Sequence, residues 1–186
     1  RVLVAHELPY ALVGDLYRAA TDCGFDVLRP MMLGGQAPSR EVKPTAFRPD
    51  PVLDSLTLGE RRWKARMREV ALLERLMLDA DPTVVAHLLR NPRVTERHVL
   101  KLASRRPNRP TILTEVARSA WLLRPTVQRA LALNPFSPVR LAVMIAPLLL
   151  PAELREVSRD QTLHPSLQEA ARGLLALRLA LRPTRP

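Results

Sequence analysis

Few residues in this chain have side chains suited to catalysis or metal binding: there are four histidines and one cysteine. His6, His87, His98 and His164 are scattered, with no pair at i, i+4 and none beside the cysteine, so no metal-binding motif occurs. His87 and His98 could meet in one helical hairpin, where we expect two surface histidines rather than a site. Cys23 lies on an apolar stripe without an adjacent histidine, which favours a buried apolar role over that of a nucleophile.

Motifs of the common enzyme classes are also missing from the sequence. It contains no G-x-S-x-G, P-loop or G-x-G-x-x-G pattern, and the pair Gly34–Gly35 is not followed by the Lys-Ser/Thr of a P-loop. Carboxylate pairs such as Glu153 and Glu156 stand among arginines, which is typical of a solvated helix face. We therefore expect a protein that is not an enzyme and that holds no metal or cofactor.

Arginine is the chemical group that this chain has in excess. The net charge is +11, and 26 of the 29 basic residues are arginine. Residues 1–56 carry six basic and seven acidic residues, whereas residues 57–186 carry the other 23 basic residues and 11 acidic ones, so the excess lies in the second segment. Both a bias of GC-rich coding sequence and a phosphate-binding face would produce it. Arg97, Lys101 and Arg105 follow at intervals of four and share one helix face. The candidate basic patch consists of Arg61, Arg62, Lys64, Arg90, Arg93, Arg97, Lys101, Arg105, Arg106 and Arg109.

The segment that must position these side chains is Pro82–Arg172, in which an apolar triad recurs about every 14 residues. The first triad is Val85, Leu88 and Leu89, and its spacing of i, i+3, i+4 forms one stripe of an α-helix. The following triads are Val99/Leu102/Ala103, Leu113/Val116/Ala117, Val127/Ala130/Leu131, Leu141/Met144/Ile145, Leu154/Val157/Ser158 and Leu167/Ala170/Ala171.

Proline separates the triads into individual helices. Pro82, Pro110, Pro138 and Pro151 each lie three residues before a triad. Because proline fits the first turn of a helix and not its interior, a continuous coiled coil is excluded. Two short helices then make a repeat of about 28 residues, a size typical of solenoids. We predict an all-α protein: a right-handed α-solenoid of short antiparallel helix pairs with an N-terminal helical hairpin.

Polar residues mark several helix starts. Residues 57–60 have the form of a capping box, S/T-x-x-E. Asp81-Pro82 and Ser137-Pro138 each give an N-cap residue followed by a first-turn proline. We expect a basic helix from Leu58 to about Met67 and a partner helix over Glu69–Leu78. The triad of that partner is Leu73, Leu76 and Met77.

The N-terminal part has a different composition, which suggests three segments. Residues 1–33 predict a helical hairpin that packs on the repeats, with Gly24 as a C′ glycine and a second short helix over residues 25–33. Residues 34–56 form a Pro/Gly-rich loop or linker, and residues 57–182 form the helical repeat domain.

The last repeat unit leaves an apolar stripe without a partner. In Pro165–Arg182, Leu175 and Leu179 fall outside the core stripe, although a terminal repeat should present a polar outer face. These two leucines are a candidate apolar interface. The tail of the chain, its N-terminal hairpin, a second copy of the chain or a protein partner could each cover it.

The composition also indicates the localisation that we expect. A single cysteine excludes an internal disulfide, and no stretch of 18 apolar residues or signal-type apolar region occurs. We expect a cytoplasmic protein without a membrane span.

Two stretches carry a resemblance to known repeat families: DPTVVAHLLRNPRVTERHVLKLA and NPFSPVRLAVMIAPLLLPAELREVSRD. Their proline, small polar cap and Leu/Val/Ala stripe resemble the HEAT-like and leucine-rich-repeat-variant groups of α-solenoids, a bacterial-type repeat, over roughly Leu58–Leu175. The resemblance implies a binding scaffold. Two features depart from it. Leucine-rich-repeat variants can hold an iron–sulfur cluster, for which Cys23 alone is insufficient, and 28 residues is short for a HEAT repeat. Some HEAT-like proteins are DNA glycosylases, but no motif transfers their catalytic residues to this chain.

Two hypotheses of function follow. The first is a non-catalytic interaction scaffold that binds another protein through the solenoid surface; an acidic partner would suit the basic patch, and the C-terminal helix could join two copies of the chain. The alternative is a nucleic-acid-binding module that uses the Arg-rich face. Within the basic runs only Trp63 could stack on a base, so recognition of a single-stranded sequence has little support.

Overall fold

The computed structural model describes residues 10–24, 38–40, 50–67 and 70–180. All regular elements within these ranges are helices, which confirms the predicted all-α class. In chain order they are α1 (Tyr10–Asp22), α3 (Pro51–Asp54), α4 (Leu58–Arg66), α5 (Val70–Leu76), α6 (Pro82–Leu88), α7 (Glu96–Ser104), α8 (Pro110–Arg118), the 3₁₀ helix η3 (Ala120–Leu123), α9 (Pro125–Ala132), α10 (Val139–Ile145), the 3₁₀ helix η4 (Ala146–Leu148), α11 (Pro151–Arg159) and α12 (Pro165–Ala180).

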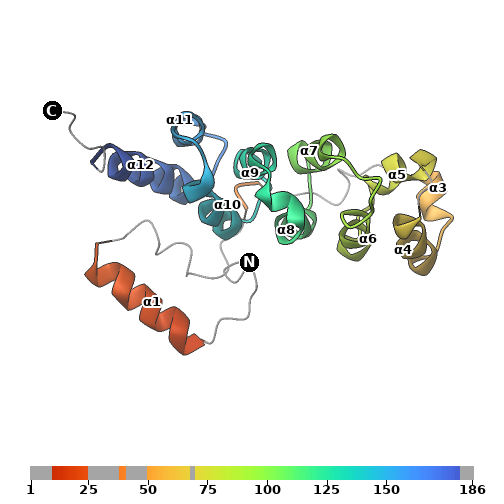
Figure 1. Cartoon of the computed structure of the whole chain (residues 1–186), viewed down its shortest axis with the longest axis horizontal. Coiled ribbons are helices and arrows are strands. Elements are labelled where there is room, and N and C mark those ends of the chain that lie inside the picture. The colour runs from red at the N-terminus through yellow and green to blue at the C-terminus, as the bar shows by residue number, and fades with distance from the viewer. Residues whose placement is uncertain (1–9, 25–37, 41–49, 68–69, 181–186) are drawn as a thin grey trace.

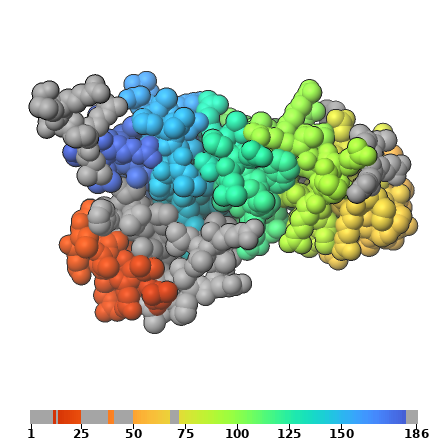
Figure 2. Space-filling model, viewed as in Figure 1, coloured from red at the N-terminus to blue at the C-terminus, as the bar shows by residue number. Residues whose placement is uncertain are grey.

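The helices from α4 to α12 form an elongated array (Figures 1 and 2). In Figure 1, α4, α6, α8 and α10 lie in one row and α5, α7, α9 and α11 in a second row. Along the rows, α4 packs on α6, α6 on α8 and α7 on α9, while α12 packs on both α10 and α11. Each helix therefore contacts helices that are one or two places away in the chain, and the core extends along the array instead of surrounding a centre.

The predicted triads form this core. Val85, Leu88 and Leu89 are 0%, 0% and 5% exposed, and the later triads are buried in the same way. The exceptions are Ala130, Met144 and Ser158, which are half-buried. The earlier triad of Leu73, Leu76 and Met77 is buried as well. The 14-residue spacing in the sequence is thus the spacing of the residues that contact a neighbouring helix.

Proline begins most of the helices in the array. Three of the four predicted first-turn prolines occupy the first helical position, where their missing N–H group would have no intrahelical partner. The prolines at a first helical position in the array are Pro82, Pro110, Pro125, Pro151 and Pro165.

Two of the predicted caps are present. The Thr57 N–H donates to Glu60 Oε2 at 2.7 Å, and the Glu60 N–H donates to Thr57 Oγ1 at 3.3 Å, which completes the capping box. Asp81 Oδ1 accepts from the N–H groups of Thr83 and Val84 at 2.8 and 3.2 Å. Side chains thus satisfy the first amides of α4 and α6.

The predicted cap at Ser137-Pro138 is wrong. Helix α10 begins one residue later, at Val139, and Pro138 occupies the N-cap position. The buried Ser137 hydroxyl instead donates to the carbonyl oxygen of Leu131 at 2.7 Å. Ser137 therefore satisfies the C-terminal end of the preceding helix, α9, and not the start of its own.

Two buried asparagines each join the turn after one α-helix to the end of the α-helix two places earlier in the chain. Asn91 Nδ2 donates to the carbonyl oxygens of Ala65 and Met67 at 2.8 and 2.6 Å, at the end of α4. Asn134 Nδ2 donates to the carbonyl oxygens of Ala103 and Arg105 at 2.7 and 3.0 Å, at the end of α7. The two asparagines are 5% and 2% exposed, so these bonds replace water that cannot reach the carbonyls.

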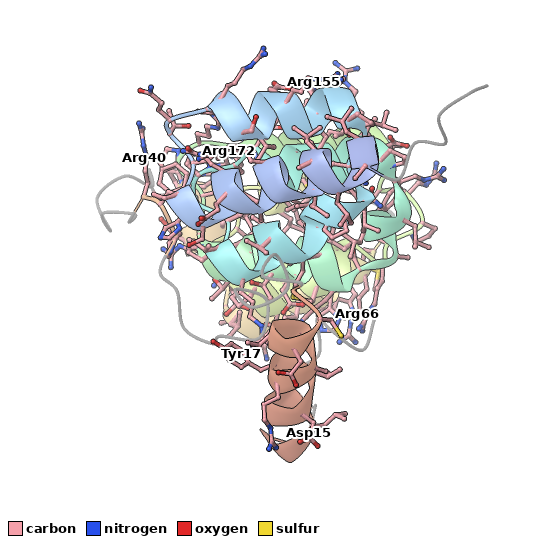
Figure 3. The ribbon with its side chains drawn as sticks, turned by 90° about the vertical axis from the view of Figure 1, so that its left-hand side faces the viewer. Asp15, Tyr17, Arg40, Arg66, Arg155 and Arg172 are labelled. Carbon is pink, nitrogen blue, oxygen red and sulfur yellow. The ribbon has the colours of Figure 1, made fainter. Side chains whose placement is uncertain are left out.

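The N-terminal region is described in part. Helix α1 is present and extends away from the array (Figures 1 and 3), and Gly24 follows it with φ of +69°, as predicted for a C′ glycine. The prediction that Cys23 is a buried apolar residue is wrong: it is exposed, because no described segment covers that side of α1. The predicted second helix over residues 25–33 lies outside the described residues.

Two contacts fix the described ends of the linker segment to the array. The Arg40 N–H donates to the carbonyl oxygen of Pro135 at 3.2 Å, in the turn between α9 and α10. Asp50, the N-cap of α3, accepts from Arg75 Nη1 at 3.2 Å, at α5. Residue 40 and residue 50 are therefore held at different places along the array.

We predict that Asn134→Asp destabilises the protein by about 2 kcal/mol, the cost of leaving buried polar groups without partners. The aspartate keeps an acceptor for the Phe136 N–H, which Asn134 Oδ1 binds at 3.0 Å, but it cannot donate to the two carbonyls of α7. Urea unfolding followed by circular dichroism measures the change. Gln161→Ala, at an exposed residue of the turn between α11 and α12, is the control; equal stability of the two variants would contradict the prediction.

Candidate functional site

The ten residues of the candidate basic patch come from three parts of the array. Seven of them lie on or beside α7, and they divide into two groups by their position along the chain. One group lies between the end of α6 and the first turn of α7, and it consists of Arg90, Arg93 and Arg97. The second group lies between the last turn of α7 and the start of α8, and it consists of Lys101, Arg105, Arg106 and Arg109. The remaining three, Arg61, Arg62 and Lys64, are on α4.

Arg61 belongs to a buried ion pair. Its Nη1 lies 2.7 and 2.8 Å from the two carboxylate oxygens of Asp79, whose side chain is fully buried. Asp79 also accepts from the N–H of Asp81 at 2.9 Å, immediately before α6. The pair joins α4 to the turn between α5 and α6, so Arg61 stabilises the fold and is not available to a ligand.

The second group mostly contacts the protein itself. Arg105 Nη1 donates to the carbonyl oxygen of Leu78 at 3.4 Å, and Arg106 Nη2 donates to the carbonyl oxygen of Leu133. Burial lowers the pKa of Arg105, and the charge of Arg109 lowers it further. Lys101 Nζ lies 3.8 Å from Glu74 Oε1 on α5. These cations are held at neighbouring helices, and a small hollow of about 180 Å³ between α5 and α7 lies beside them.

The first group is different. The side chains of Arg90, Arg93 and Arg97 are exposed, and within the described part of the chain they make no hydrogen bond or ion pair. Of the predicted patch, these three arginines present their full charge to solvent.

The structure adds two residues that the sequence did not single out as a pair, Arg66 and His87. Arg66 Nη2 lies 3.0 Å from His87 Nε2. Partial burial lowers the pKa of His87 below its ordinary value, and the charges that lower it further belong, in decreasing order, to Arg66, Arg90 and Arg62. The residues come from neighbouring helices, α4 and α6, and are separated by 21 positions, so no local motif could have revealed them.

A larger hollow lies beside Arg90. Its volume is about 630 Å³, and it is bounded by the turn after α6 and by the end of α8 with η3, including Arg90, Arg118 and Trp121. The Trp121 Nε1–H donates to the carbonyl oxygen of Leu89 at 3.0 Å. Arg118 pairs with Glu115 at 3.0 Å, so a carboxylate offsets the charge on that side of the hollow.

The two leucines of the candidate apolar interface are in different environments. Leu175 is half-buried and packs against the core, whereas Leu179 is 62% exposed. Leu177 is 44% exposed on the same last turns of α12. The segment around η4 adds Leu148 and Leu150, which are 55% and 62% exposed.

Arg178 joins these two leucine-bearing segments. Its Nη1 and Nη2 donate to the carbonyl oxygens of Leu149 and Pro147, both at 2.7 Å. The end of α12 is therefore fixed against η4, and both segments carry exposed leucines. We call Leu148, Leu150, Leu177 and Leu179 the apolar end.

Comparison with protein-family models, with curated proteins and with solved structures finds no match to this chain. In the described ranges, no helix combines the length and apolar character that a membrane span requires. The same ranges contain no group of three or more His, Cys, Asp or Glu side chains placed to hold a metal ion.

We predict that Arg66→Gln raises the pKa of His87 toward its ordinary value of 6.5, because one of the repelling charges is removed. NMR titration of the histidine ring protons, assigned with His87→Gln, measures the change. Arg155→Gln, at an exposed arginine on α11, is the control (Figure 3). An unchanged titration in Arg66→Gln would show that Arg66 does not act on the imidazole.

The same shift makes stability depend on pH. The unfolded chain binds the His87 proton more tightly than the folded chain, because the folded-state pKa is lowered. The contribution of His87 to the free energy of unfolding is therefore present above the ordinary histidine pKa and is lost as the pH falls through the lowered value. In Arg66→Gln this loss should be smaller, which urea unfolding at several pH values between 7 and 5 would measure.

Proposed function

We propose that this protein is a right-handed α-solenoid that serves as a non-catalytic scaffold and binds another protein through the surface of its repeats. Support comes from helix packing that advances by one repeat at a time and from the polar bonds between residues 24 to 32 positions apart. A surface of this kind is extended and can contact a partner over several repeats. The resemblance to HEAT-like and leucine-rich-repeat-variant proteins is consistent with this proposal.

The observation that carries the proposal is the apolar end. Its four leucines are between 44% and 62% exposed, although they lie at the last unit of the array, where a polar surface is expected. Exposed apolar side chains on two segments that are fixed to each other are a candidate interaction site. The partner that fits it presents an apolar helix or loop.

A nucleic-acid-binding module is the second function that the sequence suggested. Several of the basic side chains that it would use contact the protein itself in the structure. Of the ten predicted basic residues, Arg61 is in a buried pair and Lys101, Arg105 and Arg106 contact neighbouring helices. A duplex would need a series of phosphate contacts along one face. Within the predicted patch, the described arginines without partners occupy a short stretch around the turn between α6 and α7.

We predict that Leu177→Glu/Leu179→Glu weakens binding of the protein partner by on the order of 100-fold, since burying each leucine contributes about 1.5 kcal/mol or more. The partner is captured with the tagged full chain from its native cell, with and without nuclease, identified and purified. Isothermal titration calorimetry then compares the variants.

The control is Leu123→Glu, at a leucine that is 82% exposed on η3 and lies outside the apolar end. Its affinity for the partner should equal that of the unaltered protein. Binding that survives the double change would remove the apolar end as the interface, and capture that nuclease abolishes would favour the nucleic-acid alternative. Light scattering of the purified chain tests whether the apolar end binds a second copy of the chain and not another protein. A dimer that the double change dissociates would assign the apolar end to self-association.

A further inference from the structure

Four basic side chains converge where the C-terminal half of α4 meets the end of α6. Arg62 and Arg66 lie one helical turn apart on α4, His87 is in the last turn of α6, and Arg90 follows two residues after that helix. The two helices pack against each other in the same row of the array. We call Arg62, Arg66, His87 and Arg90 the arginine–histidine cluster.

The contacts in the cluster define the state of its imidazole. Arg66 Nη2 lies 3.0 Å from His87 Nε2. A guanidinium group can only donate, so Nε2 accepts and the ring is neutral with its proton on Nδ1. Arg62 Nε donates to Thr83 Oγ1 at 2.7 Å, which orients the guanidinium and leaves its terminal amino groups available.

Among the residues that the structure describes, no carboxylate balances the centre of the cluster. The groups that shift the pKa of His87 are burial and the three arginines, and all of them disfavour its protonation. Asp81 lies at the other end of α6, and its own pKa is lowered in part by Arg62, so it offsets the charge of Arg62. The charges of Arg66 and Arg90 have no such partner within the described chain. Like charges at this density repel, and an anion placed between them would remove the repulsion.

Carboxylates offset part of the positive charge farther along the array. Farther along the array, Arg118 pairs with Glu115 at 3.0 Å and Arg124 lies 3.8 Å from Glu96. A polynucleotide backbone that followed the array would meet these carboxylates. A single, strongly charged group fits better, and planar guanidinium groups bind a phosphate through paired N–H donors.

We propose that the arginine–histidine cluster binds the dianion of a phosphate monoester, carried either by a small ligand or by a phosphorylated side chain. The proposal does not depend on the apolar end or on the scaffold function. Arg66 and Arg90 contact the phosphate oxygens, Arg62 adds charge from α4, and His87 takes up a proton as the dianion binds.

The experiment titrates the full chain with inorganic phosphate, with O-phosphoserine, with a short phosphoserine peptide and with a DNA duplex. Binding is followed by NMR shifts of the His87 ring and by calorimetry. Inorganic phosphate and O-phosphoserine should both move the His87 signals and raise its pKa, and Arg66→Gln and Arg90→Gln should each weaken O-phosphoserine binding at least fivefold. The control is Arg155→Gln, whose exposed side chain lies on the opposite side of the array from Arg66 (Figure 3) and should bind like the unaltered chain.

The probes identify the source of the phosphate. Tighter binding of the phosphopeptide than of O-phosphoserine would assign a phosphorylated side chain, and equal binding would assign a small ligand; both support the cluster as a phosphate site. Unmoved His87 signals with every phosphate monoester would overturn the proposal. An equal loss of O-phosphoserine affinity in Arg155→Gln would also overturn it, as would binding of the duplex alone with a steep dependence on salt. Both results would indicate a general attraction of polyanions.

Discussion

The shortness of the helices is the constraint on which the rest of this structure depends. In the array, most helices have seven to nine residues, and each α-helix leaves its last four carbonyl groups without an intrahelical partner. About half of the carbonyls in such a helix therefore need another donor. Water supplies it at the surface, but the helix ends that face a neighbouring repeat are buried, and an unpaired buried carbonyl costs free energy. Side chains from other helices of the array are therefore needed to reach those ends.

The side chains that meet this need are distributed regularly. Asn91 and Asn134 donate to carbonyls at the ends of α4 and α7, Trp121 donates to Leu89, and Arg178 donates to two carbonyls near η4. In these bonds the donor and acceptor are 26 to 32 residues apart, close to the repeat length of about 28 residues that the sequence predicts. The apolar triads bring consecutive helices together without directional preference. The hydrogen bonds then fix the position of one repeat relative to the next, and together the two interactions determine how the array advances.

The different roles of the apolar triads and the hydrogen bonds explain what could be predicted from the sequence. Burial of the triads follows from a periodic pattern, so their positions were predictable from Val85 to Ala171, and proline marked the starts of α6, α8 and α11. The asparagine bonds were not predictable, because Asn91-Pro92 and Asn134-Pro135 resemble ordinary turn dipeptides. Ser137 was assigned to the wrong helix for the same reason: a hydroxyl near a helix boundary can serve the helix before it or the helix after it, and only the tertiary contact decides. Cys23 was misassigned because an apolar stripe does not show whether another segment covers it.

The basic residues also divide into those that satisfy carbonyl groups at helix ends and those that do not. A cation near a helix C-terminus is favoured by the helix dipole, and arginine can donate to one or two carbonyls while lysine offers a single point charge. Arg105, Arg106 and Arg178 are used in this way, so part of the net charge of +11 follows from building a fold out of short helices. Arg66 and Arg90 also lie at helix C-terminal ends, those of α4 and α6, but they do not satisfy carbonyl groups. Within the described chain neither donates to a carbonyl, and both charges act on a neutral imidazole that they repel when it is protonated. The need to satisfy carbonyls therefore does not account for these two charges, whereas an anion bound between them, as proposed above, would relieve their repulsion.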